Sequence, residues 1–160
     1  MNKSVFFLWF ALVPHAVLGQ VCNSSMEVSG ESGRFVNLND GFVLDVVTML
    51  RWDFCTYGQT YENGNCSGSP MEYATWQDAL GASASASGRR LPNIKELATL
   101  VERSCIEPAI NQDVFPDTPL YVYWSNTPAS SGEGMIIDFT DGSEIIRDIN
   151  RPRVMRLIAE

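Results

Sequence analysis

The stretch that most constrains the fold covers residues 89–102. Pro92 disfavours helical backbone angles at the residue before it, so the chain arrives extended. Asn93 can then cap a helix, and Glu96, three residues later, has the spacing of a capping box. The apolar residues that follow at helical spacing are Ile94, Leu97, Ala98 and Val101. The stretch therefore predicts an amphipathic helix, and such a helix is stable only if the rest of the chain covers its apolar face.

The beginning of the chain has the pattern of an export signal. Lys3 gives a positive start, residues 5–13 are apolar, and a small-residue cleavage site follows. The apolar run is too short to span a bilayer. We therefore expect a mature protein that is periplasmic or secreted and has no membrane span. The expected division of the chain is a signal peptide at 1–19, a polar lead-in at 20–33 and one domain at 34–160.

Four cysteines follow the signal, and an even number in an exported chain indicates two disulfides. Three pairings are possible, and we favour Cys55–Cys66 and Cys22–Cys105. The first closes a short loop over Asn63-Gly64, which is a strong turn signal. The second ties the start of the mature chain to the end of the central helix. A four-cysteine zinc site is the alternative, but no C-x-x-C spacing supports it.

The net charge and the histidine content exclude several classes of function. Without the signal the chain keeps ten basic and 19 acidic residues, a net charge of −9 that opposes binding to nucleic acid or anionic membranes. His15 is the single histidine and lies in the signal, so a Ser-His or Cys-His nucleophile is excluded from the mature protein. A carboxylate pair for glycoside hydrolysis remains open, although no spacing singles one out. We expect a protein that is not an enzyme and has no cofactor.

The order of predicted elements indicates an α+β domain with two helices packed on a small, mainly antiparallel sheet. The first helix should begin at Thr75, which has capping-box spacing to Asp78. The central helix should end near residues 104–105. The predicted strands are 34–38, 42–47, 120–124, 135–139, 144–147 and 153–158.

Several blocks resemble, in order, the Lcl C-terminal domain family of bacterial surface and periplasmic proteins. The blocks include 39–41, 75–80, 90–97, 108–111, 123–125, 138–142 and 154–156. The most recognisable signature consists of Arg90, Leu91, Pro92, Asn93, Glu96 and Leu97. The resemblance covers about residues 34–158 and implies a C-type-lectin-like fold with its terminal strands side by side. One departure is Arg89, where the family often has Trp.

Two candidate binding sites emerge. Trp124, Ser125 and Asn126 should lie exposed at a strand end, where they could contact a sugar or a protein. Arg151 and Arg153 could form an anion site, since the resemblance is to an adhesin whose terminal domain binds sulfated polysaccharide. Ordinary ion pairing of these arginines with nearby acids is the alternative. Trp52 and Trp76 are expected in the core.

Calcium is a further candidate, because Asp138 with Asp141, or Asn37 with Asp40, could supply oxygen ligands. The spacing is not that of an EF-hand, and the Glu-Pro-Asn and Trp-Asn-Asp motifs of calcium-dependent lectins are missing. We favour backbone turns for these residues and expect no metal.

The resulting hypothesis is an exported, non-catalytic recognition or adhesion module that binds a surface glycan or a protein. An alternative is a structural or assembly subunit of an envelope or surface complex. A weaker alternative is a hydrolase that works without histidine.

Overall fold

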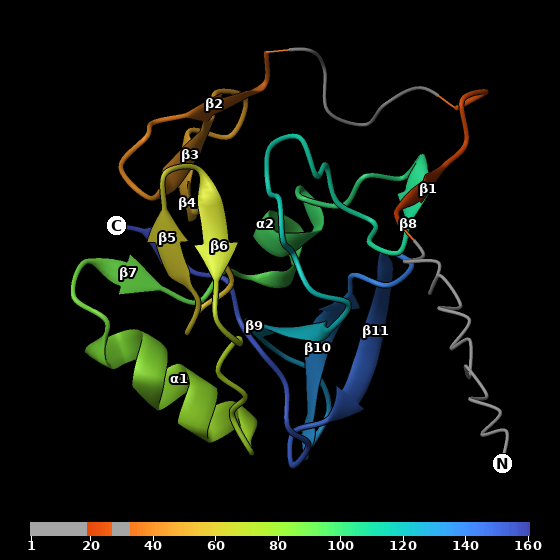
Figure 1. Ribbon diagram of the computed structural model, residues 1–160. Coiled ribbons are helices and arrows are strands. Elements are labelled where there is room, and N and C mark those ends of the chain that lie inside the picture. The colour runs from red at the N-terminus through yellow and green to blue at the C-terminus, as the bar shows by residue number, and fades with distance from the viewer. Residues whose placement is uncertain (1–18, 27–32) are drawn as a thin grey trace, which may run out of the picture.

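The computed structural model describes residues 19–26 and 33–160 and shows an α+β domain (Figure 1). The predicted signal peptide lies outside the described residues except for Gly19, as does the part of the lead-in at 27–32. The helices are α1 (Trp76–Ser85) and α2 (Ile94–Ala98). The strands are β1 (Val21–Cys22), β2 (Phe35–Asn37), β3 (Phe42–Asp45), β4 (Leu50–Asp53), β5 (Thr60–Glu62), β6 (Asn65–Ser67), β7 (Arg89–Arg90), β8 (Cys105–Ile106), β9 (Val122–Pro128), β10 (Glu133–Asp138), β11 (Ser143–Asp148) and β12 (Ile158–Ala159).

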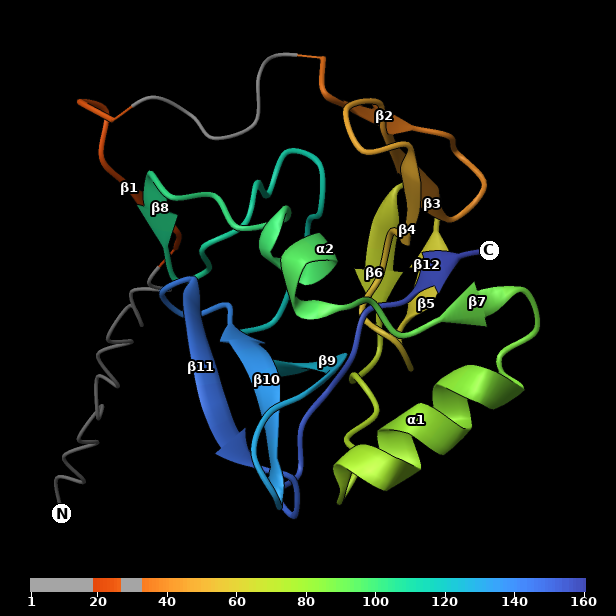
Figure 2. The same ribbon diagram turned by 180° about the vertical axis from the view of Figure 1, so that it is seen from behind.

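The described strands form two larger sheets and two small ribbons. The five-stranded sheet has the order β2-β3-β4-β12-β7, the three-stranded sheet has the order β11-β10-β9, and the ribbons are β1-β8 and β5-β6. All these strand pairs are antiparallel. Figures 1 and 2 show α2 at the centre between the two larger sheets, with α1 at the periphery. The main core accordingly joins Trp52 of β4, Leu97 of α2 and Ile137 of β10.

The opening hairpin forms as predicted. Phe35 pairs with Asp45, and Asn37 pairs with Val43 across the turn. The turn needs left-handed backbone, which Gly41 supplies at a φ of 90°.

Helix α2 begins as predicted but ends earlier. Asn93 and Glu96 form both hydrogen bonds of the capping box, and Leu97 is fully buried. The helix stops at Ala98 and does not reach residues 104–105, because the following backbone pairs with another segment. Val101 forms a β-bridge with Ile110. The prediction of a helix to residue 104 is therefore wrong, since pairing with residue 110 replaces the last turns.

The end of the chain also differs from prediction. Instead of a strand over residues 153–158, isolated bridges at Arg153 and Val154 are followed by β12. The terminal strands are not side by side, because β12 lies between β4 and β7 while β2 lies at the sheet edge and β1 pairs with β8. This order matters for function, since β12 joins the hairpin β3-β4 to β7.

Both predicted disulfides are confirmed. Cys22 and Cys105 lie opposite each other on β1 and β8 and form one bond. Cys55 and Cys66, which are eleven positions apart, form the other and close a loop that contains β5 and the start of β6. None of the described helices is long and apolar enough to cross a membrane.

Candidate functional site

The first predicted binding site is buried. Trp124 and Ser125 are 0% exposed, because β9 runs on to Pro128 and places them within the sheet. Trp76 Nε1 donates a hydrogen bond to the Ser125 carbonyl at 2.8 Å, and Ser125 Oγ donates to the Met135 carbonyl at 2.7 Å. The prediction of an exposed site here is wrong, and these residues join α1 to the three-stranded sheet.

Asn126 instead supports the signature segment. Its Nδ2 donates to the Leu91 carbonyl at 3.1 Å, and its backbone N–H donates to the Pro92 carbonyl at 2.8 Å. Residues 91–92 thus take their backbone partners from β9, so Asn126 is a structural residue.

The signature itself also has a structural explanation. The Arg90 guanidinium donates to both Glu96 carboxylate oxygens, at 2.8 and 2.7 Å. One of those oxygens accepts from the Asn93 backbone N–H as well. The hydrogen bonds from Arg90 lower the pKa of Glu96. Leu91 and Leu97 fill the core on either side of this network, so the signature fixes the start of α2.

The second predicted site is also not assembled. Arg151 is exposed, whereas Arg153 is 7% exposed. The Arg153 guanidinium lies 4.4 Å from the centre of the Trp124 ring and donates to the Asp148 carbonyl at 2.9 Å. The two arginines therefore do not present one surface anion site, because stacking on Trp124 draws Arg153 into the fold.

In the turns considered for calcium, carboxylate oxygens accept hydrogen bonds from backbone N–H groups. Asp138 Oδ1 accepts from the Thr140 N–H, and Asp141 Oδ1 accepts from the Ser143 N–H. Asp40 Oδ1 accepts from the Phe42 N–H. Within residues 19–26 and 33–160, no three His, Cys, Asp or Glu side chains cluster in a way that could hold a metal ion.

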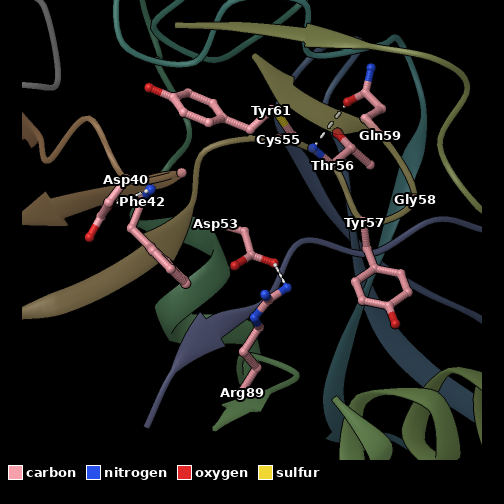
Figure 3. Close-up of a pocket in the computed structure, with 11 residues that line it drawn as sticks. Asp40, Phe42, Asp53, Cys55, Thr56, Tyr57, Gly58, Gln59, Tyr61 and Arg89 are labelled. Carbon is pink, nitrogen blue, oxygen red and sulfur yellow. Dashed lines mark hydrogen bonds and ion pairs between the residues drawn. The ribbon is translucent and has the colours of Figure 1, made fainter. Parts of the chain in front are cut away.

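An open pocket of about 320 Å³ lies where β3, β4 and β7 meet the stapled loop, and we name it the Asp53 pocket (Figure 3). Its centre holds Asp53 and Arg89, with aromatic rings around them in Figure 3. The lining residues are Asp40, Gly41, Phe42, Asp53, Cys55, Thr56, Tyr57, Gly58, Gln59, Tyr61 and Arg89.

Backbone contacts hold the walls of this pocket in place. The Phe54 N–H donates to the Gly41 carbonyl at 2.9 Å and joins the opening turn to the stapled loop. Gly58 has a φ of 97°, and a Cβ there would lie 2.4 Å from the Met71 backbone nitrogen. Only glycine fits this position. Gln59 Oε1 accepts from the Thr56 N–H and ties the loop to itself.

The electrostatics of the pocket centre on Asp53. Burial raises the pKa of its carboxyl to about 6, and the positive charges of Arg89 and Arg156 offset part of that rise. Arg89 Nη1 lies 3.4 Å from Asp53 Oδ2. At the rim, Arg51 Nη2 lies 2.6 Å from Asp40 Oδ2. Each carboxylate in the lining is therefore paired with one guanidinium.

Aromatic rings complete the lining. The Arg51 guanidinium lies 4.0 Å from the centre of the Phe42 ring, and that of Arg89 lies 5.6 Å from it. Tyr61 packs edge-on against Phe54, and Tyr57 and Tyr61 are both half-buried. The pocket thus combines apolar ring surface with hydrogen-bond donors and acceptors, a combination that fits a small polar ligand.

Sequence reasoning missed this site. The sequence predicts only a stapled loop at residues 55–70, and it marks Arg89 only as a departure from a family pattern. Asp53 and Arg89 are 36 positions apart, and no local spacing connects them. The aromatic and amide side chains inside a disulfide-closed loop were the one available signal, since loops held by a rigid scaffold often bind ligands.

Comparisons with known proteins bear on the family alone. No curated protein and no solved structure is significantly similar to the chain. The model of the Lcl C-terminal domain matches residues 41–159, a span that includes the Asp53 pocket apart from Asp40. Because this match covers most of the sequence, the chain belongs to the Lcl C-terminal domain family.

Proposed function

We propose that this protein is an exported, non-catalytic recognition module that binds a glycan in the Asp53 pocket. The observation that carries the proposal is the composition of that pocket. Aromatic rings lie beside the Arg89 guanidinium, whose side chain is 39% exposed, and the Asp53 carboxylate, whose side chain is 10% exposed.

A sugar offers two kinds of surface at once. Its hydroxyl groups donate and accept hydrogen bonds, and its C–H faces pack against aromatic rings. In the pocket, Asp53 can accept, Arg89 can donate, and Phe42 and Tyr61 offer ring surface. A purely apolar ligand would leave the Asp53–Arg89 pair desolvated without compensation.

The setting of the domain supports an extracytoplasmic role. Two disulfides are typical of proteins outside the reducing cytoplasm. A C-type-lectin-like architecture is part of the proposal. Its support is the pair of helices, the small antiparallel sheets and the two disulfides.

A specific observation favours a second candidate function, assembly with another protein. The turn between β3 and β4 exposes three apolar side chains, with exposed fractions of 44% for Val46, 67% for Val47 and 71% for Met49. A contiguous exposed apolar patch can mark a site of contact with another protein. This turn would then serve an envelope or surface complex.

Glycan-array binding with the mature protein tests the proposal. The wild-type protein should bind at least one glycan, and Tyr61→Ala and Asp53→Asn should each weaken that binding at least about tenfold, because they remove ring surface and an ionised acceptor. Glu144→Gln on β11 is the matched control, since Glu144 is an exposed acid outside the pocket lining.

The negative outcomes are equally informative. Absence of binding to every glycan would refute the proposal, and capture of an envelope protein that depends on Val47 and Met49 would support the second candidate. Turnover of a bound glycan, abolished by Asp53→Asn, would instead establish the hydrolase alternative and refute the non-catalytic role.

A further inference from the structure

We infer that the Asp53 pocket selects an uncharged sugar unit, and that Asp53 and Arg89 together bind its neighbouring hydroxyl groups. The inference rests on the proposed function, because it names the ligand class of the same site. It also assigns the specificity to two residues, one of which stands where the family often has another side chain.

The lining contains two acids, Asp40 and Asp53, and one arginine, Arg89; Arg51 pairs with Asp40 from outside the lining. Asp53 faces Arg89 at its centre, and Asp40 faces Arg51 at its rim. A sulfate or carboxylate that binds Arg89 would lie beside the Asp53 carboxylate, whose negative charge repels it. An ammonium group would meet the corresponding penalty from the guanidinium. Balanced pairs therefore disfavour both kinds of charged ligand.

The ion pair at the rim is short, whereas the Arg89–Asp53 pair at the centre is long and leaves donors and acceptors available, so we call it open. Arg51 binds Asp40 at 2.6 Å and also lies over the Phe42 ring. The Arg89–Asp53 contact is a single one of 3.4 Å, and the Arg89 side chain is 39% exposed. A guanidinium has five N–H donors, and Asp53 takes one of them. Arg89 therefore keeps donors for a ligand hydroxyl while the carboxylate keeps acceptor sites.

The side-by-side placement of donor and acceptor matches the chemistry of adjacent hydroxyl groups. One hydroxyl can accept from Arg89 while its neighbour donates to Asp53, and hydrogen bonds to charged partners are stronger than those between neutral groups. In Figure 3, Phe42 lies to the left of this pair, Tyr61 lies above it and Tyr57 lies to its right. They can contact the C–H faces of a ring held there.

The size of the pocket agrees with a small ligand. At about 320 Å³ it lies at the lower end of the range for ligand sites. It is open on one side, so the rest of a polysaccharide can continue into solvent.

The inference is tested with polysaccharides that differ mainly in charge. Suitable pairs are dextran with dextran sulfate, galactan with carrageenan, and xylan with glucuronoxylan, each immobilised and probed with the mature protein. The neutral member of at least one pair should bind at least tenfold more tightly than its charged partner. Binding should change little between low and high salt, because screening acts on net charge interactions.

Variants connect that preference to the two residues. Arg89→Gln and Asp53→Asn should each reduce binding to the neutral polysaccharide about tenfold or more. The double variant should lose less than the product of the two single losses, since the residues bind one ligand as a unit. Arg147→Gln is the control for loss of an arginine, because Arg147 is exposed on β11 and outside the pocket.

The possible outcomes distinguish failure of the inference from failure of the proposed glycan-binding function. Tighter binding to a sulfated or uronic member, weakened by salt and by Arg89→Gln, would overturn the inference and leave the glycan-binding function in place. Binding to the neutral polysaccharide that is unchanged by Arg89→Gln would also overturn the inference. Absence of binding to all six polysaccharides and to the wider array would remove the function as well. An unchanged midpoint of thermal unfolding for Arg89→Gln excludes misfolding as the cause. We expect no change, since the Arg89 side chain is 39% exposed.

Discussion

Replacing Asp53 by Asn should make the folded protein more stable at neutral pH. The pKa of the Asp53 carboxyl is raised by burial from 3.8 to about 6 despite the charges of Arg89 and Arg156. Since one pKa unit corresponds to about 1.4 kcal/mol, keeping Asp53 ionised costs the fold roughly 3 kcal/mol. Asparagine has nearly the same size and carries no charge, so Asp53→Asn should recover up to about this amount.

The raised pKa of Asp53 also determines how the free energy of unfolding changes with pH. From about pH 4 to about pH 6 the unfolded chain has lost the Asp53 proton while the folded chain still holds it. The folded state binds more protons in this window, so stability falls as the pH rises and is level above it. The difference in unfolding free energy between Asp53→Asn and wild type should therefore be near zero at pH 4 and largest at pH 7.

Urea denaturation followed by tryptophan fluorescence, with the disulfides intact, measures this difference at each pH. An Asp53→Asn variant that is less stable than wild type at pH 7 would refute the reasoning, because it would mean that the contact with Arg89 outweighs the cost of burial. That result would also weaken the description of the Asp53–Arg89 pair as open.

Asp45 provides the matched control, because it is also a buried aspartate beside an arginine. Burial alone would raise the pKa of Asp45, but hydrogen bonds from Arg34, Thr48 and the Val47 N–H outweigh it and lower the pKa. Asp45→Asn should therefore destabilise the protein at pH 7, by about 3–5 kcal/mol if it behaves as a broken buried pair. The loss should shrink only at acidic pH below the ordinary aspartate range.

Three further predictions concern the scaffold. Leu97→Ala should lower the free energy of unfolding by about 2–5 kcal/mol, because Leu97 is fully buried in the main core; a loss below about 0.5 kcal/mol would contradict that position. Gly58→Ala should destabilise by more than about 1 kcal/mol through contact with Met71, whereas Gly81→Ala, with open space around it inside α1, should stabilise by about 0.5–1 kcal/mol. Equal effects of the two glycine changes in thermal melts would be evidence against the tight turn. Thiol titration of the denatured but unreduced mature protein should find no free thiol, and reactive thiols would contradict the two disulfides.

Features set by neighbours in the sequence were predictable. The caps at Thr75 and Asn93 follow from side chains that reach backbone groups three residues away. The opening hairpin follows from a turn that needs left-handed backbone at Gly41. The short disulfide follows from a turn that brings Cys55 and Cys66 together. In each case the interaction that fixes the geometry lies within about a dozen residues.

Burial along β9 was not predictable from the same kind of evidence. An alternation of aromatic and polar residues says which side chains share a face, but it does not say what covers that face. Trp124 and Ser125 are buried because α1 and β10 cover them; Met135 of β10 is ten positions from Ser125, but Trp76 of α1 is 49 positions away. The position of Arg153 depends on Trp124 in the same way. For this reason the exposure predicted for Trp124 and the shared surface predicted for Arg151 and Arg153 were both wrong.

The Asp53 pocket depends on the strand that sequence reasoning placed least well. Phe42 and Asp53 are direct neighbours across β3 and β4, so the β3-β4 pairing alone sets their contact. Arg89 reaches them because Ile158 of β12 pairs with Trp52 on one side and with Arg90 on the other. The last strand is thus the spacer that sets the distance between acceptor and donor. A site that needs the end of the chain to join its middle leaves no local pattern, and for that reason the structure was needed to find it.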